Sequence, residues 1–238
     1  MIKTIFKAAD RGLADHGWLK ANHTFSFAGY HNPKKINFGA LRVLNDDTVA
    51  PAMGFSRHPH DNMEIVTIPL SGALKHEDSA GNSEVIYHGD VQHMSAGSGI
   101  YHSEKNANSN AEVKLFQIWI FPKKRDIEPV YHQKTFQVAD RNNKFQTVVS
   151  PFLEDNAVEI NQDALIYLGN FDKNITTNFS KRIAGNGIFL MIIEGAIDVL
   201  GETLEKRDAI GIENLDEIQL NSLADNTELM IIEVPMEF

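Results

Sequence analysis

The sequence predicts an all-β protein, built as a sandwich or a barrel. Short apolar segments rich in β-branched and aromatic residues recur along the chain. Turn-forming clusters separate these segments by roughly 8–12 residues, a spacing typical of antiparallel sandwiches and barrels. Helical periodicity is scarce, which argues against alternating strand and helix units.

Individual strands and turns can be placed from these signals. The clearest strands are bounded by Gly, Pro, Asn or Asp and occupy residues 40–44, 64–70, 115–121 and 229–234. Turn signals occur at residues 45–47, 71–72, 80–82, 88–90 and 97–99. One short helix is expected within residues 155–168.

Two properties change along the chain and predict two domains. All ten histidines lie within the first 132 residues. Residues 1–150 carry a net charge of +2, whereas residues 151–238 carry −12. We therefore expect an N-terminal domain, residues 1–140, that carries the chemistry. A C-terminal domain, residues 141–238, would lack a histidine-based metal site, and the polar stretch from Asp140 to Lys144 marks the boundary.

The second domain repeats the strand rhythm of the first. Residues 188–195 resemble residues 64–72, because each is an apolar strand that ends in glycine. Residues 206–212 resemble residues 88–94, because each is a turn containing Asp followed by a strand. The pattern indicates a weak internal duplication whose second copy lacks metal ligands.

Composition limits the classes of function. The 238 residues, 42% of them hydrophobic, are enough for a sizeable core. The absence of cysteine excludes disulfides and thiolate ligands, so a metal would need His, Asp, Glu, backbone or water. No apolar run is long enough for a bilayer and residues 1–7 are too charged for a signal segment, so we expect a cytoplasmic protein without membrane contact. The net charge of −10 gives no electrostatic footprint for direct nucleic-acid binding.

Two short motifs predict a metal site. His58 and His60 are two residues apart, as are His102 and Glu104. Residues i and i+2 of a strand point to one face, so two adjacent strands would bring three imidazoles and one carboxylate together. That donor set suits a divalent first-row metal. Glycines before each pair, such as Gly54 and Gly97, allow a sharp turn or a close approach of strands.

Other candidate residues near these motifs have several interpretations. Glu64 shares strand parity with the histidine pair, so it is either a ligand or an acceptor that orients an imidazole. His23 either lines the pocket or packs structurally. Three further histidines are expected on the surface or in loops rather than at the metal, namely His76, His88 and His93.

The two motifs resemble the cupin motifs in the form found in pirins. The resemblance is specific over about residues 10–122 and thins to a strand rhythm beyond them. It rests on residues 58–64, 95–104, 17–19, 23–27 and 38–47.

The resemblance implies a bicupin, with two β-barrels packed face to face and the metal in the N-terminal one. It implies four metal ligands and places Glu64 outside them; the ligands are His58, His60, His102 and Glu104. Fe(II) is the metal that the resemblance implies first, and Zn, Ni, Mn, Co and Cu also suit such a site.

Pirins are similar to cupin quercetinases, which implies a metal-dependent dioxygenase that cleaves quercetin-like flavonols with O2. A flavonol-like aromatic molecule and O2 would be its substrates. Glu104, the only carboxylate among the ligands, is then the catalytic proton acceptor. The alternative is an iron-dependent redox sensor that binds a protein partner, and the same residues would serve it. A metal-holding β protein is the third interpretation. A monomer is favoured over an oligomer.

Overall fold

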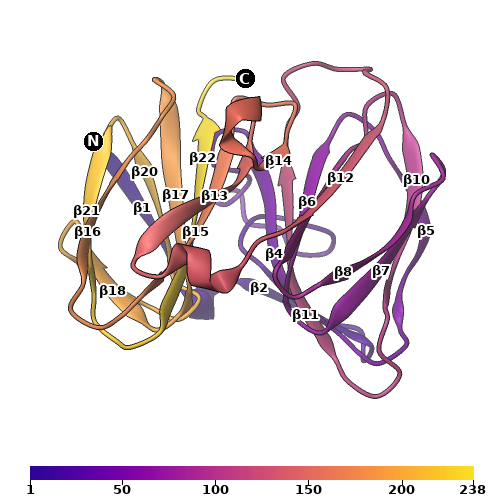
Figure 1. The fold of residues 1–238 in the computed structure, drawn as a ribbon, viewed down its shortest axis with the longest axis horizontal. Coiled ribbons are helices and arrows are strands. Elements are labelled where there is room, and N and C mark those ends of the chain that lie inside the picture. Colours follow the sequence, from indigo (N-terminus) through magenta and orange to yellow (C-terminus); the bar gives the residue numbers. More distant parts are fainter. The chain divides into compact units, whose positions relative to one another are not determined.

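The chain folds into β-strands and short 3-10 helices, in a computed structural model that describes residues 1–238 (Figure 1). It divides into two units. The N-terminal unit comprises Gly12–Phe136 and Val158–Gln162, and the C-terminal unit comprises Met1–Arg11, Gln137–Ala157 and Asp163–Phe238. None of the helices is long and apolar enough to cross a membrane.

The N-terminal unit contains two antiparallel sheets. The larger has the order β12-β9-β6-β11-β4-β3-β2 and the smaller has the order β5-β10-β7-β8. The strands of the larger sheet are β2 (Gly12–Asp15), β3 (Leu19–His23), β4 (Leu41–Val49), β6 (Glu64–Ser71), β9 (Asp90–Ser95), β11 (Val113–Ile120) and β12 (Val130–Thr135). Those of the smaller are β5 (Gly54–His60), β7 (Ala73–Asp78), β8 (Ser83–Tyr87) and β10 (Ile100–Asn106), and the short β14 (Val158–Glu159) also belongs to this unit.

The C-terminal unit repeats this arrangement. Its larger sheet runs β1-β20-β17-β22-β15-β13 and its smaller sheet runs β16-β21-β18-β19. The strands are β1 (Ile2–Phe6), β13 (Lys144–Ser150), β15 (Leu165–Phe171), β16 (Thr176–Ser180), β17 (Asn186–Glu194), β18 (Ala196–Val199), β19 (Glu202–Glu205), β20 (Ala209–Glu213), β21 (Glu217–Ser222) and β22 (Thr227–Pro235). The 3-10 helices are η1 (Ala8–Asp10), η2 (Val138–Arg141) and η3 (Leu153–Asp155).

The strand order supports the internal duplication. The sequence β9-β6-β11-β4 in one unit corresponds to β20-β17-β22-β15 in the other, and β5-β10-β7-β8 corresponds to β16-β21-β18-β19. The two segments that resemble each other in sequence, 64–72 and 188–195, fall on the equivalent strands β6 and β17. The two units therefore share the same strand order in this part of their sheets.

The boundary between the two units is not one position near residue 140, because each unit contains more than one segment of the chain. The first strand, β1, pairs with β20 from Ile2 opposite Glu213 to Phe6 opposite Ala209, so residues 1–11 belong to the C-terminal unit. In that unit β1 takes the sheet position that β12 takes in the N-terminal unit. The N-terminal segment therefore covers an edge of β20 that would otherwise leave unpaired backbone groups.

Two local predictions are wrong. No helix forms within residues 155–168, because Asn156 ends η3 in a left-handed conformation and Leu165 begins a buried strand paired on both sides. The turn expected at residues 45–47 is the middle of β4, which pairs with β3 and β11. In both places long-range pairing outweighs the local preference of the residues.

The interiors of the two units differ in polarity. One apolar cluster fills the C-terminal unit and includes inward residues of both sheets, such as Leu190, Ile210, Ile218 and Leu220. The N-terminal unit has separate apolar clusters, one around Leu74 and Leu115 and another around Ile65, Met94 and Ile100. Buried polar side chains of the same unit include His76, Glu104 and Gln117.

One carboxylate anchors the segment that follows β1. Asp208 accepts hydrogen bonds from Lys7 Nζ at 2.8 Å, from the amide of Ala8 at 2.8 Å and from that of Glu205 at 3.2 Å. Burial opposes ionisation of Asp208, but the hydrogen bond from Lys7 and those from the two amides outweigh it and hold its pKa below the ordinary value. The ionised carboxylate is therefore the form that stabilises the fold.

We predict that Asp208→Asn lowers the free energy of unfolding by about 1–3 kcal/mol at pH 7, the cost of weakening buried hydrogen bonds to a charge. Because the folded pKa of Asp208 is lowered, its stabilisation is full above about pH 4 and is lost as the pH falls further. Denaturant unfolding of both proteins at pH 7 and pH 3 checks this. A stability gap of the same size at both pH values would contradict it.

Candidate metal centre and cavity

The two predicted ligand pairs lie on neighbouring strands. His58 and His60 are on β5, His102 and Glu104 are on β10, and His102 is directly opposite His58 in the antiparallel register. The ring centroids of His58 and His102 are 4.5 Å apart, and His60 lies 4.9 Å from His58 and 4.8 Å from His102. One nitrogen of each ring lies within 4.8 Å of those of the other two. The structure thus brings three imidazoles to one point.

A β-bulge shapes this part of β5. The register passes from His102 opposite His58 to Glu104 opposite Phe55, so β5 contains one residue more than β10 over this step. The extra residue shifts the alternation, and Phe55 as well as His58 faces the cavity. Gly54 is needed beside the bulge, since a Cβ there would lie 2.2 Å from the carbonyl oxygen of Glu104.

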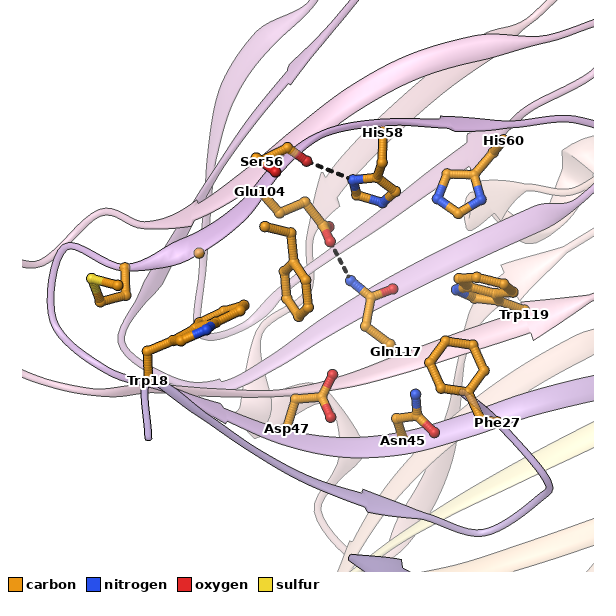
Figure 2. Close-up of a pocket in the computed structure, with 13 residues that line it drawn as sticks. Trp18, Phe27, Asn45, Asp47, Ser56, His58, His60, Glu104, Gln117 and Trp119 are labelled. Atoms are coloured by element: carbon orange, nitrogen blue, oxygen red, sulfur yellow. Dashed lines mark hydrogen bonds between the residues drawn. The ribbon is translucent and has the colours of Figure 1, made fainter. Parts of the chain in front are cut away.

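Hydrogen bonding prepares His58 to bind a metal. Its Nδ1 donates to the backbone carbonyl of Ser56 at 2.7 Å, which leaves Nε2 with a free lone pair (Figure 2). That Nε2 lies 3.0 Å from Nε2 of His102. Two nitrogens bound at right angles to one ion at about 2.1 Å would be about 3.0 Å apart. The spacing therefore suits two ligands of one metal.

The other two imidazoles are neutral at physiological pH. Burial, followed by repulsion from His58, lowers the pKa of His60 to about 4. Burial also lowers the pKa of His102, and His60, His58 and His76 lower it further. A metal binds the neutral form of imidazole, so these rings need not lose a proton first.

Glu104 is buried next to this triad but is not part of it. Its carboxylate accepts hydrogen bonds from Gln117 Nε2 at 2.7 Å and from Thr67 Oγ1 at 3.3 Å, both on the larger sheet. Glu104, His76 and His102 form a second group whose possible donor atoms lie within 4.8 Å of one another. Burial raises the pKa of Glu104 above its ordinary value. The structure therefore places Glu104 at the same cavity as His58 and His60, already oriented by two donors.

The prediction that His76 lies on the surface or in a loop is wrong. His76 is fully buried on β7, opposite Glu104 on β10, and its Nε2 lies 3.1 Å from Asp78 Oδ2. Its Nδ1 is buried without a hydrogen-bond partner. Strand alternation within Ala73–Asp78 gives the signal that was missed, because it places His76 on the same face as the buried Leu74.

Glu64 has a structural partner outside the triad. It is completely buried and accepts hydrogen bonds from His93 Nε2 at 2.8 Å, Ser95 Oγ at 2.6 Å and the amide of Asn161 at 3.0 Å. Burial opposes its ionisation, but the bond from His93 and the other donors lower its pKa. Strand parity between His60 and Glu64 did not predict these hydrogen bonds of Glu64. Residues 61–63 separate β5 from β6, so the alternation of side chains does not continue from one to the other. His93 is accordingly buried, also against prediction, whereas His88 is exposed as expected.

A cavity of about 500 Å³ adjoins the triad. Its walls include four aromatic rings, and Figure 2 shows Trp18, Phe27 and Trp119 among the labelled side chains. His23 is not among the lining residues and packs instead, with its Nδ1 2.9 Å from Asn45 Oδ1. The complete lining is Trp18, Phe27, Asn45, Asp47, Met53, Gly54, Phe55, Ser56, His58, His60, Glu104, Gln117 and Trp119.

Comparison with known proteins identifies the family. Residues 6–120 match the family Pirin, and residues 147–234 match the quercetinase C-terminal cupin domain. The chain belongs to the pirin family. It is 43% identical over 223 residues to a pirin-like protein of Caulobacter vibrioides, covering 93% of this chain and 95% of that protein. It is 37% identical over 229 residues to quercetin 2,3-dioxygenase of Escherichia coli, covering 96% and 97%.

A crystal structure supports the assignment of this chain to the pirin family. The crystal structure of the bacterial pirin YhhW from Escherichia coli, in complex with nickel(II), is similar with a TM-score of 0.92 and 35% identity. The similarity covers 98% of this pirin and 99% of that chain. The two units of this pirin are thus cupin-type β units, and the bicupin fold predicted from the sequence is confirmed as a pair of such units.

We predict that His58→Ala or His102→Ala reduces bound metal from about one equivalent to a small fraction, because each removes one of three converging imidazoles. The fold should persist, since neither His58 nor His102 is a member of the apolar clusters of this unit. Elemental analysis and circular dichroism measure the two effects. His88→Ala, at an exposed histidine, is the matched control and should keep its metal. Stoichiometric metal in either triad variant would refute the ligand assignment.

Proposed function

We propose that this pirin is a metal-dependent dioxygenase that cleaves quercetin-like flavonols with O2. The observation that carries the proposal is the convergence of three imidazoles beside a buried carboxylate, at the wall of an aromatic-lined cavity. The name of the Escherichia coli relative, quercetin 2,3-dioxygenase, supports the same reaction.

The proposed metal ligands are His58, His60 and His102, with Glu104 as the fourth. Three neutral nitrogens and one carboxylate oxygen suit Fe(II) and the later divalent ions of the first row. The similar bacterial pirin was solved in complex with nickel(II), which supports the binding of a divalent ion by this pirin. We propose Fe(II) as the native metal.

A bound divalent metal would act as a Lewis acid that lowers the pKa of a coordinated hydroxyl group. Glu104 is the carboxylate placed to take the proton of a flavonol hydroxyl. Burial raises its pKa above the ordinary value of a glutamate. Gln117 and Thr67 hold its two oxygens, so the carboxylate keeps its orientation while it gains and returns the proton.

The cavity walls would position the substrate. Trp119 lies edge-on to His60, with ring centroids 4.9 Å apart, and also edge-on to Phe27 at 5.2 Å. Trp18 and Phe55 form a second edge-to-face pair at 5.2 Å. Two rigid aromatic pairs suit a flat polycyclic molecule, because they bury its faces and lose little side-chain entropy on binding.

We predict that Glu104→Gln retains most of its metal through the three imidazoles but lowers quercetin turnover by about 10²-fold or more, the usual contribution of a general base. Loss of quercetin absorbance together with O2 uptake measures turnover, and elemental analysis measures metal. Glu84→Gln, at an exposed glutamate, is the control for a change of charge.

Two results would count against this proposal. Unchanged activity in Glu104→Gln would remove Glu104 from the reaction. Wild-type protein loaded with Fe(II) that consumes no O2 with quercetin would refute the dioxygenase itself.

A further inference from the structure

Three polar residues stand in the middle of a central strand. Asn45, Asp46 and Asp47 lie in β4, between β3 and β11, although their side chains favour turns. Asn45 is 4% exposed and Asp47 is 3% exposed. A buried polar residue that opposes its local structure is retained against a cost in stability, which marks a functional position.

Two oxygen atoms in this region lack partners. Asp47 Oδ1 and Gln117 Oε1 are each buried without a hydrogen bond. An unpaired buried acceptor costs about 1–3 kcal/mol, so native proteins rarely leave two together. Two other polar atoms nearby have partners, since Gln117 Nε2 donates to Glu104 and Asn45 Oδ1 pairs with His23.

Both unpaired oxygens belong to residues that line the cavity. In the β4–β11 pairing Gln117 is opposite Asn45 and Leu115 is opposite Asp47, so Asp47 and Gln117 are diagonal neighbours on one face. Figure 2 shows the Asp47 carboxylate and the Gln117 amide within the same cavity. They come from the larger sheet, whereas His58 and His60 come from the smaller one.

Burial favours the neutral form of the Asp47 carboxyl group. Burial, with added repulsion from Asp46 and Glu104, raises the pKa of Asp47 to about 8. A neutral carboxyl group donates one hydrogen bond and accepts others, which matches the donor and acceptor of a phenolic hydroxyl.

We propose that Asp47, with Gln117 beside it, recognises a second hydroxyl group of an aromatic substrate, separate from the hydroxyl that faces the three imidazoles. The inference rests on the proposed function, because it assumes that a hydroxylated aromatic molecule occupies the cavity. It narrows the substrate class to flavonols that carry a hydroxyl group in addition to the one beside the carbonyl. A phenol would donate to one of the two unpaired oxygens and accept from the Asp47 carboxyl group.

The test compares two ligands on the metal-loaded protein under anaerobic conditions, where no turnover occurs. Quercetin carries further ring hydroxyls, whereas 3-hydroxyflavone carries only the hydroxyl beside its carbonyl. Isothermal titration calorimetry should give a Kd for quercetin about tenfold or more below that for 3-hydroxyflavone with wild-type protein. Asp47→Leu should abolish the preference and change the Kd for 3-hydroxyflavone by less than about threefold. Asp47→Asn, which can still donate and accept, should keep part of the preference.

A second measurement separates recognition from a structural role. Asp47→Leu removes an unpaired buried oxygen, so the melting temperature of the ligand-free protein should stay equal or rise. A structural residue would instead lower it. A quercetin preference retained in Asp47→Leu overturns the inference, and so does a lower melting temperature with an unchanged preference.

The outcomes also separate this inference from the dioxygenase proposal. Binding with an Asp47-dependent preference, but without O2 uptake in air, would refute the dioxygenase and leave the recognition role standing. Normal quercetin turnover by wild type and Asp47→Leu, with equal Kd values for both ligands, would refute only the recognition role. A wild-type protein that binds neither flavonol refutes both.

Discussion

The antiparallel pairing of β10 with β5 is the constraint on which the candidate centre depends. It puts His102 directly across from His58, and the one-residue bulge then brings Phe55 rather than Ser56 opposite Glu104. A shift of one residue would turn the imidazoles to the outer face, because side chains alternate along a strand. Backbone hydrogen bonds between the strands thus hold the imidazole-bearing residues in register.

The two units share a strand order but differ in the polarity of their interior side chains. In β10 the inward residues include His102 and Glu104, whereas in the equivalent β21 they include Ile218 and Leu220. Apolar residues fill the C-terminal interior with well-packed side chains and stabilise it. The N-terminal interior buries imidazoles, amides and carboxyl groups, which costs stability wherever a partner is missing. Burial of unpaired polar groups lowers the stability of that unit, and some of these groups line its cavity.

Buried polar groups in the N-terminal unit differ in role according to whether they have hydrogen-bond partners within the protein. Glu64 has three donors and joins β6, β9 and the segment at Asn161, so it stabilises the fold. Glu104 is held by Gln117 and Thr67 yet faces the cavity, so its orientation is set before any ligand arrives. Asp47 Oδ1 has no partner within the protein. Glu64, with all its partners inside the protein, supports the fold. Asp47 Oδ1, without a partner, is available to a ligand.

The sequence by itself determined the strand character of the chain, the repeated rhythm of two units and the two i, i+2 pairs that supply the three imidazoles and the neighbouring Glu104. Those signals are local, since alternation and turn residues act over a few positions. Tertiary structure alone decided that β1 completes the C-terminal unit, that β5 carries a bulge, that His76 is buried beside Glu104, and that Asn45–Asp47 form a strand. The physical reason is that pairing partners and register are chosen by the summed backbone hydrogen bonding and burial of whole sheets. That sum can hold a turn-forming triplet in a central strand, and no short window of residues reveals it.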